Sequence, residues 1–148
     1  MDRVPDTIFA IYFSPYTAHA IEIGSVVYPT VEHAYQCQRY NDPKIIAEIL
    51  TARSPVKAWE ISSKYKHLQV PDFREHKLET MKKLMTMKAI QHREVRDALL
   101  ASQKAQIVKH ITTYPPGDGF WDDGEHGEGL NHMGKIWMEI RDELKHFA

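Results

Sequence analysis

The sequence has few of the features that mark secreted, membrane-spanning or duplex-binding proteins. Cys37 is the only cysteine among 148 residues, so an internal disulfide is impossible, which favours a reducing compartment. The apolar run near the N-terminus spans about six residues, too few for a membrane helix or a signal-peptide core. The formal net charge of −1 implies no broad basic surface, although a local basic pocket stays open. We therefore expect a soluble, cytoplasmic protein with no membrane partner.

Signatures of metals, cofactors and reactive thiols are also lacking. The acids and histidines of residues 118–132 match neither paired cysteines nor the HExxH arrangement. Cys37 stands in no nucleophile motif, and we expect it to be a small buried residue on a helix. The sequence thus predicts no metal and no cofactor, and it shows no obligate protein partner.

Composition and local signals together indicate the fold class. Hydrophobic residues make up 43% and charged residues 26%, as in ordinary globular proteins. The length suits one domain over residues 1–148, and no repeat or long linker divides the chain. Residues 20–29 predict a β-hairpin around Gly24 and Ser25. We expect a compact, mainly α, single-domain fold with this small hairpin near the N-terminus.

Helix start signals recur along the chain. Thr30 fits an N-cap for a helix reaching about Tyr40, and Asp42–Pro43 and Ser54–Pro55 repeat the signal. Asp72 is followed by Glu75 at capping-box spacing. Further helices are predicted over 93–102 and 131–147, while 105–113 is ambiguous between helix and strand. The inward stripes of the two longest helices are predicted to hold Leu78, Met81, Leu84, Met85 and Lys88, and Ile136, Ile140 and Leu144.

The stretch "YPTVEHAYQCQRY", residues 28–40, carries polar groups where a core-facing stripe is usually apolar. Glu32, Gln36 and Arg39 follow one another at spacings of four and three. Glu32 alone is explained by the helix dipole, a term of about 0.3–1 kcal/mol, and Arg39 alone by a surface cation. If the stripe faces a cleft, the same residues offer an acid or base and a cation on one wall.

Glycine is concentrated near the C-terminus, where six of the seven glycines fall within residues 117–134. Ordering glycine is costly, so the cluster forms either a long surface connection or a loop whose N–H groups approach a ligand. The loop leads into the last helix, whose N-terminus would favour an anion. Phe120 and Trp121 within it would stack on a base or sugar face, or anchor the loop to the core, and the two roles are compatible.

Together these segments suit cleavage at the anomeric carbon of a phosphorylated sugar. The early helix supplies Glu32, and the late loop supplies Asp118, Asn131 and the ring pair. Such cleavage passes through an oxocarbenium-like state that carboxylates stabilise. This interpretation requires the two distant segments to converge on one pocket.

Two motifs resemble those of the YbiA-like, or NADAR, family. "YPTVEHAYQCQRY" is similar to the signature YPT-x-EH-x-x-Q-x-x-K, and "DGFWDDGEHGEGLNHMGKIWMEIRDEL" to D-x-(F/Y)-W-G-x-G-x-x-G-x-G-x-N-x-L-G-x-x-L-M-x-x-R. "ARSPVKAWEI" and "MKKLMTMKAIQHREVRDALLAS" resemble the segments between them. The resemblance covers roughly residues 13–146 and implies a compact, mainly α fold with N-glycosidase chemistry.

The resemblance also implies roles for individual residues. Glu32 would be the catalytic carboxylate, with Asp118 and Asn131 orienting the ribose. Arg39, which stands where the family has lysine, would hold phosphate together with Lys88 and the loop amides. The remaining substrate-binding residues would be Gln36, Phe120, Trp121, Gly127, Gly129 and Gly134. Arg141 matches the terminal arginine and would serve equally as a structural ion pair.

Three departures from the family pattern bear on the substrate. Asp122 stands where the family has glycine, Phe73 about where it has tryptophan, and Pro15 where it has asparagine. A carboxylate at 122 would be strained at positive φ and would repel a phosphate. The favoured substrate is ADP-ribosylated guanine, with single-stranded or ADP-ribosylated nucleic acid as partner. Early riboflavin-pathway intermediates, a non-catalytic ADP-ribose or NAD sensor, and a helical interaction module are the alternatives.

Overall fold

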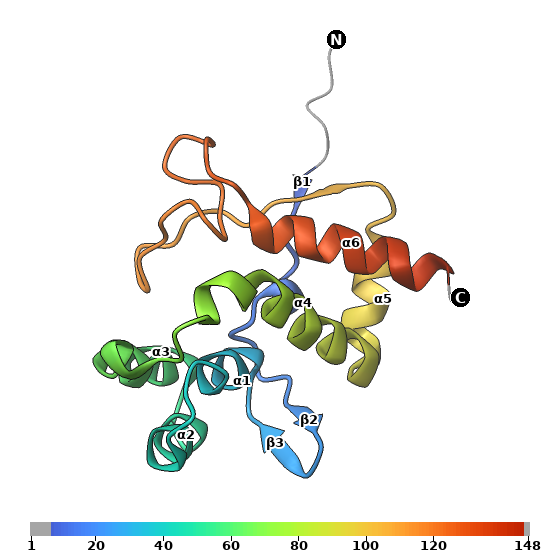
Figure 1. The fold of residues 1–148 in the computed structure, drawn as a ribbon. Helices are drawn as coiled ribbons and strands as arrows, with labels where there is room; N and C mark the ends of the chain where they lie inside the picture. The colour runs from blue at the N-terminus through green and yellow to red at the C-terminus, as the bar shows by residue number, and fades with distance from the viewer. Residues whose placement is uncertain (1–6, 147–148) are drawn as a thin grey trace. The chain divides into compact units, whose positions relative to one another are not determined.

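The computed structural model describes residues 7–146, which form two compact units. One unit comprises Ser14–His92, and the other combines the chain before Ser14 with the chain from Arg93 onward. Most of the ordered elements are helices, as the sequence predicts (Figure 1). No helix within residues 7–146 is long and apolar enough to cross a membrane. The single domain over residues 1–148 stays a prediction.

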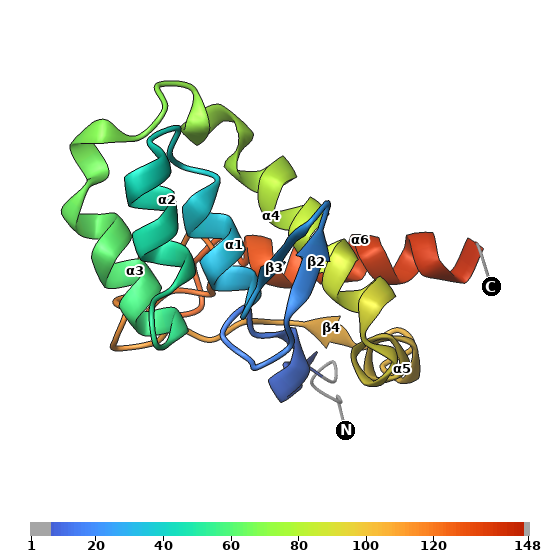
Figure 2. The ribbon, with the colours of Figure 1, turned by 90° about the horizontal axis from the view of Figure 1, so that it is seen from below.

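The unit Ser14–His92 is a small helical cluster with a hairpin. Helix α1 packs against α2, α3 and α4, and the hairpin contacts α4 and α1 (Figure 2). The hairpin pairs Ile21 with Tyr28, and Gly24 turns the chain at φ +62°. The elements are β2 (Ile21–Ile23), β3 (Val26–Tyr28), α1 (Val31–Cys37), α2 (Pro43–Leu50), α3 (Pro55–Lys64), the 3₁₀ turn η2 (Lys66–Leu68) and α4 (Phe73–Gln91).

Three of the four predicted helix starts in this unit are confirmed by their cap hydrogen bonds. The Thr30, Asp42 and Ser54 side chains accept from the backbone N–H groups of His33, Lys44 and Lys57 at 3.1, 2.9 and 3.0 Å. Each satisfies a donor that the first helical turn leaves unpaired. Helix α1 ends at Cys37, three residues before the predicted end.

The helix start predicted at Asp72 is confirmed, because α4 begins at Phe73, but the predicted capping box is wrong. Asp72 precedes α4 with φ −96° and ψ 7°, and its side chain makes no cap hydrogen bond. An N-cap side chain reaches the helix amides from an extended backbone, which Asp72 does not adopt. Its carboxylate instead lies 3.6 Å from His76 Nε2. The α4 stripe is otherwise buried as predicted, except that Leu78 at its N-terminal end is exposed.

The second unit contains the C-terminal helix and a short parallel strand pair. Its elements are β1 (Thr7–Ile8), the 3₁₀ turn η1 (Ile11–Phe13), α5 (Arg93–Ala101), β4 (Gln106–Ile107) and α6 (His132–His146). Within the ambiguous segment 105–113 only Gln106 and Ile107 form a strand, because they pair with Thr7 and Ile8. A pairing between residues about 100 positions apart leaves no local signal.

Helix α6 carries the core of this unit. Trp137 is fully buried, stacks near Phe13 at 5.2 Å between centroids, and donates from Nε1 to the Phe13 carbonyl at 2.9 Å. Ile136 and Ile140 are buried as predicted, whereas Leu144 is only partly buried. Arg141 Nη1 donates to Ser102 Oγ and the Ala105 carbonyl at 2.9 and 2.8 Å, so these contacts are hydrogen bonds to uncharged groups, and the ion pair stays a prediction.

Candidate functional site

Helix α1 buries the acid that the sequence singles out. Glu32 is 5% exposed and Gln36 3%, and Gln36 Nε2 donates to Glu32 Oε1 at 2.7 Å. The dipole alone would leave a first-turn carboxylate in water, where its charge is solvated. Burying it is costly unless polar partners compensate, so the dipole does not account for Glu32. An acid held by an amide inside a helical cluster is the arrangement expected at a functional site.

The neighbour of Glu32 in the sequence locks the helix in place. His33 is 1% exposed, with Nδ1 at 2.8 Å from Thr30 Oγ1 and Nε2 at 3.0 Å from the Ala52 carbonyl. A carbonyl only accepts, so Nε2 carries the proton and Nδ1 accepts from the Thr30 hydroxyl. His33 thereby joins the start of α1 to the end of α2, which fixes the frame that carries Glu32.

Arg39 continues the polar stripe just beyond α1. Its guanidinium carbon lies 4.7 Å from the Phe73 ring centroid and 5.2 Å from that of Tyr35, and Nη1 donates to Gln69 Oε1 at 3.0 Å. The Nε atom is buried and has no hydrogen-bond partner among residues 7–146. Phe73, one of the departures from the family pattern, thus still supplies a ring against the cation. Burial raises the pKa of the Tyr35 phenol above its usual range.

Lys88 lies inside the same unit, fully buried on α4. Its Nζ donates to the Ser14 carbonyl at 2.7 Å and to Thr17 Oγ1 at 2.6 Å. Desolvation lowers the pKa of Lys88 to about 7. The charged and the neutral amine both have enough N–H donors for these two acceptors. The expected contact with phosphate stays a prediction, and the side chain is occupied by the protein itself.

Cys37 and the groups that could hold a metal ion were candidates for a different kind of site. Cys37 is 3% exposed, and burial raises the pKa of its thiol to about 12, so it is not a thiolate nucleophile near neutral pH. Among residues 7–146 no group of three histidine, cysteine or acidic side chains is placed to hold a metal ion.

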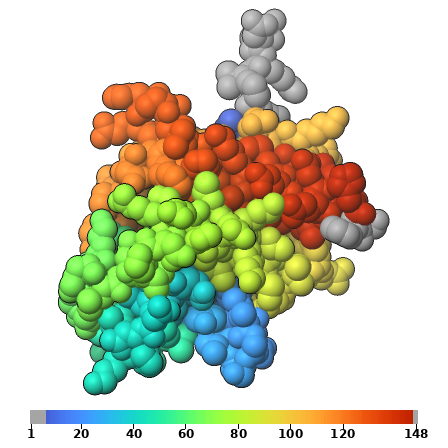
Figure 3. Space-filling model, viewed as in Figure 1, coloured from blue at the N-terminus to red at the C-terminus, as the bar shows by residue number. Residues whose placement is uncertain are grey.

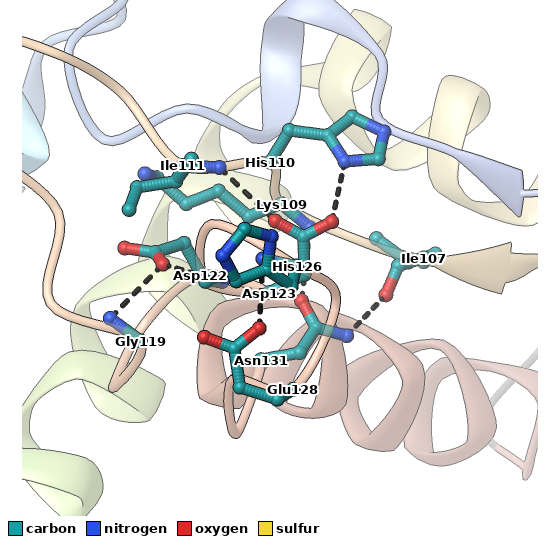
Figure 4. Close-up of polar contacts among 11 residues, drawn as sticks. Ile107, Lys109, His110, Ile111, Gly119, Asp122, Asp123, His126, Glu128 and Asn131 are labelled. Atoms are coloured by element: carbon teal, nitrogen blue, oxygen red, sulfur yellow. Dashed lines mark hydrogen bonds and ion pairs between the residues drawn. The ribbon is translucent and has the colours of Figure 1, made fainter.

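The glycine-rich segment is organised around a buried carboxylate (Figure 4). Asp122 is 2% exposed, and its Oδ1 accepts from the N–H groups of Gly119 and Gly124 at 3.0 and 2.9 Å. Gly119 and Gly124 have φ of +82° and +74°, and a Cβ at Gly117 would collide with Asp122 Oδ2. The glycines therefore let the backbone wrap around this side chain, a reason beyond the two that the sequence suggested. Asp122 itself is not at positive φ, so the expected strain is absent.

The folded loop also provides hydrogen-bond acceptors for backbone N–H groups that were expected to bind an anion. At the start of α6, the N–H groups of His132 and Met133 donate to the carbonyls of Phe120 and Trp121, each at 3.1 Å. Gly129 N donates to the Asp123 carbonyl at 2.7 Å. Two N–H groups at this helix start therefore already have acceptors that the loop supplies, and anion binding there stays a prediction. Gly127, at φ +81°, has open space where its Cβ would be.

Asn131 and Asp118 have different surroundings within this unit. The Asn131 amide is engaged at both ends, with Oδ1 accepting from Lys109 N and Nδ2 donating to the Ile107 carbonyl, each at 2.9 Å (Figure 4). Its backbone has φ +51°, a region that asparagine tolerates. Asp118 is exposed, and its Oδ1 accepts from Phe120 N at 3.0 Å. The catalytic roles of both residues stay predictions.

Two acids to which the sequence gave no role, Asp123 and Glu128, hold the loop in place. Asp123 connects it to the preceding segment, and Glu128 makes a hydrogen bond within the loop. Asp123 accepts from Ile111 N at 3.1 Å and contacts His110 Nδ1 at 2.6 Å. Glu128 accepts from His126 N at 2.7 Å, and backbone hydrogen bonds lower its pKa. The Asp122–Asp123–Gly124 triplet is a turn signal that would have indicated such backbone contacts.

Three rings meet where the loop enters α6. Phe120 lies 4.8 Å from Trp121 at 90° and 4.6 Å from His132 at 49°, and all three side chains are partly buried. His132 is an addition to the ring pair that the sequence identifies. The loop, orange in Figure 3, lies at the surface of the face shown. A partly exposed ring group of this kind can bind a flat base on one side and pack on the protein with the other.

The predicted site residues thus fall into two sets, each described within its own unit. Glu32, Gln36, Arg39 and Lys88 belong to residues 14–92, and the predicted residues of the glycine-rich segment belong to the other unit. The convergence of both sets on one pocket stays a prediction.

Comparisons with known proteins identify the family. The NADAR domain family matches residues 6–145. The chain is 33% identical to N-glycosidase YbiA of Escherichia coli (strain K12), over 94% of this chain and 89% of that protein. It is 31% identical to N-glycosidase Npun_R5314 of Nostoc punctiforme, over 90% and 85%. With Riboflavin biosynthesis protein VVA0006 of Vibrio vulnificus it shares 30% identity over 87% of this chain but 34% of that protein.

A solved structure confirms the fold. The NMR structure of Escherichia coli YbiA has a TM-score of 0.85 to this chain at 30% identity, covering 99% of this chain and 89% of that one. Sequence motifs, the family match and the fold therefore agree over nearly the whole length. The chain belongs to the NADAR-domain, YbiA-like N-glycosidase family.

Proposed function

We propose that this N-glycosidase cleaves the bond between the ribose and the base nitrogen of a phosphorylated ribosyl substrate, with ADP-ribosylated guanine in nucleic acid as the favoured substrate. The burial of Glu32 beside Gln36 carries the proposal. A carboxylate removed from water and fixed by an amide is poised to act on a developing positive charge, because the low local dielectric strengthens its effect.

In the proposed reaction a water molecule adds to the anomeric carbon of the ribose. The C–N bond breaks, and the base nitrogen leaves with the electron pair through an oxocarbenium-like state that the Glu32 carboxylate stabilises. Glu32 takes the proton from the water and passes it to the departing nitrogen, so charge and atoms balance. Gln36 keeps the carboxylate in one orientation through the 2.7 Å hydrogen bond.

Recognition of the phosphate is assigned to Arg39. Its guanidinium already contacts two rings and donates to Gln69, so little side-chain entropy is lost when an anion binds. Phe120 and Trp121 are assigned to the base, and Asp118 and Asn131 to the ribose. Gly127 and Gly129 shape the loop that presents these side chains, and Gly134 allows α6 to approach Ile107 closely.

Early riboflavin-pathway intermediates are the second candidate, and the names of relatives favour them. Riboflavin biosynthesis protein VVA0006 of Vibrio vulnificus and Riboflavin biosynthesis protein PYRR of Zea mays both match most of this chain. These intermediates also join a phosphorylated ribose to a nitrogen on a pyrimidine-like ring. The same acid, cation and rings would therefore serve them.

A hydrolysis panel separates the candidates. The protein is incubated with a single-stranded oligonucleotide ADP-ribosylated on guanine and, separately, with a ribosylamino-pyrimidine phosphate, and the products are detected by mass. We expect release of ADP-ribose from the first, and release of the base from the second would favour the riboflavin alternative. Tight nucleotide binding without any product would instead indicate a sensor.

The role of Glu32 is tested by Glu32→Gln, which keeps the shape and removes the charge. We expect turnover to fall by about 10²–10⁴-fold without loss of fold. Glu60→Gln on α3 is the matched control, because the Glu60 side chain is 42% exposed, and we expect it to leave turnover unchanged. Wild-type turnover in a folded Glu32→Gln protein would refute the assignment.

A further inference from the structure

The turn formed by residues 14–17 connects α4 to the first turn of α1. Lys88 on α4 reaches it through the two hydrogen bonds to Ser14 O and Thr17 Oγ1. Within the turn, Tyr16 N donates to Ser14 Oγ at 3.1 Å. On the other side the buried Pro15 accepts at its carbonyl from Glu32 N at 3.0 Å. The turn therefore lies between a buried amine and the backbone of the catalytic acid.

The contact with Glu32 replaces a helix cap. The first N–H groups of a helix have no partner inside the helix. Thr30 satisfies His33 N in α1, and the Pro15 carbonyl satisfies Glu32 N, so a distant segment completes the capping. The proline ring fixes φ, one of the two dihedral angles that set the direction of this carbonyl. A shift of the turn would thus move the backbone that carries the Glu32 side chain.

Lys88 is an α4 side chain that hydrogen-bonds to this turn at two points, Ser14 O and Thr17 Oγ1. Besides accepting from Lys88, Thr17 Oγ1 lies 2.6 Å from His19 Nδ1, and its hydroxyl lies 3.5 Å from the Ser14 carbonyl within the turn. Thr17 is therefore oriented from both sides, and the amine sets the position of both ends of the turn. Burying a lysine is costly, and an apolar residue would fill the same space without that cost.

We propose that Lys88 is a positioning residue for the catalytic carboxylate, acting on Glu32 through the turn of residues 14–17. The inference rests on the proposed role of Glu32. It gives Lys88 a function that needs no contact with substrate. A substrate-binding lysine would act mainly on KM, whereas a residue that orients the carboxylate acts on kcat.

The test compares Lys88→Met and Thr17→Val with Thr86→Val. Thr86 lies on the same helix, and its hydroxyl donates to the Lys82 carbonyl, so this control removes an equal group away from the turn. On whichever panel substrate the wild type hydrolyses, we expect Lys88→Met to lower kcat by about tenfold to a hundredfold with KM changed less than about threefold. Thr17→Val should lower kcat by a smaller factor, and Thr86→Val should leave it unchanged.

Hydrogen exchange of the Glu32 amide, followed by NMR, gives a second readout that does not depend on activity. We expect exchange to accelerate about tenfold or more in Lys88→Met and Thr17→Val, because the Pro15 carbonyl no longer holds that N–H. Should Lys88→Met fail to fold, Thr17→Val carries both measurements. Unchanged exchange, or wild-type kcat while Glu32→Gln is inactive, would overturn the inference, as would a change confined to KM. An active Glu32→Gln refutes the proposed role of Glu32 instead, and the exchange data still show whether Lys88 holds the turn.

Discussion

Replacing Asp122 by alanine removes the acceptor around which the glycine-rich loop is wrapped. The N–H groups of Gly119 and Gly124 lose their hydrogen bonds to Oδ1, and the side chain that they surround is 2% exposed. An unsatisfied buried donor costs about 1–3 kcal/mol. With one amide buried and the other partly buried, we expect Asp122→Ala to lower the free energy of unfolding by about 2–5 kcal/mol.

Asp122→Asn separates the geometry from the charge. The asparagine oxygen can accept the same two N–H groups, but a neutral acceptor forms weaker hydrogen bonds than a carboxylate. We expect a loss of about 1 kcal/mol, well below that of alanine. Glu125→Ala is the control from the same loop, because the Glu125 side chain is 78% exposed, and its effect should stay within about 0.5 kcal/mol.

Urea unfolding followed by far-ultraviolet circular dichroism measures these free energies, and NMR hydrogen exchange reports on the two amides. We expect the Gly119 and Gly124 amides to exchange faster in Asp122→Ala than in the wild type, because their acceptor is gone. A free energy of unfolding within about 0.5 kcal/mol of wild type, with unchanged exchange at both amides, would show that Asp122 does not organise the loop.

Three further predictions concern Lys88, Gly134 and Trp121. Lys88 has a folded-state pKa of about 7 against an ordinary 10.5, so between these values the unfolded chain binds the additional proton. The free energy of unfolding of the wild type should therefore rise with pH from about 7 upward, by at most about 1.4 kcal/mol per pH unit relative to Lys88→Met. Urea unfolding at several pH values measures this, and the same dependence on pH in both proteins would contradict it. Gly134→Ala should destabilise the protein by about 1–3 kcal/mol in the same assay, because the alanine Cβ would collide with the Ile107 carbonyl. This loss is expected despite the better helix propensity of alanine, and a more stable variant would refute the close approach of α6 to Ile107. Trp121→Ala should raise KM about fivefold to a hundredfold with little change in kcat if the ring stacks on the base, and an unchanged KM would leave it only the anchoring role.

The sequence named candidate site residues but not the partners that hold them in the fold. The family motifs pointed to Glu32, Arg39 and the glycine-rich segment, and the comparisons confirm the family. The periodicity of α4 also placed Lys88 on the buried face, as observed. Its partners Ser14 and Thr17 lie 74 and 71 positions away, and no spacing in the sequence indicates them.

The loop shows why such partners escape prediction. The clustering of glycines was plain from the sequence, but a ligand and a surface connection explained it equally well. The third explanation, Asp122 accepting from Gly119 and Gly124, appears only once the backbone has turned through positive φ. Asp122 departs from the family pattern, and in the structure its buried carboxylate is the acceptor around which the loop backbone folds.

The sequence by itself determined the family, the mainly helical class, the hairpin and the helix starts at Thr30, Asp42 and Ser54. Caps, turns and hydrophobic periods depend on residues within about four positions of one another, so the order of the amino acids contains them. Only the tertiary structure decided that Glu32 is buried, that Lys88 binds the turn of residues 14–17, and that loop carbonyls occupy the start of α6. These features depend on which groups, distant in the sequence, are brought within hydrogen-bond distance by packing. Once such groups are buried, leaving a polar group without a partner costs too much free energy.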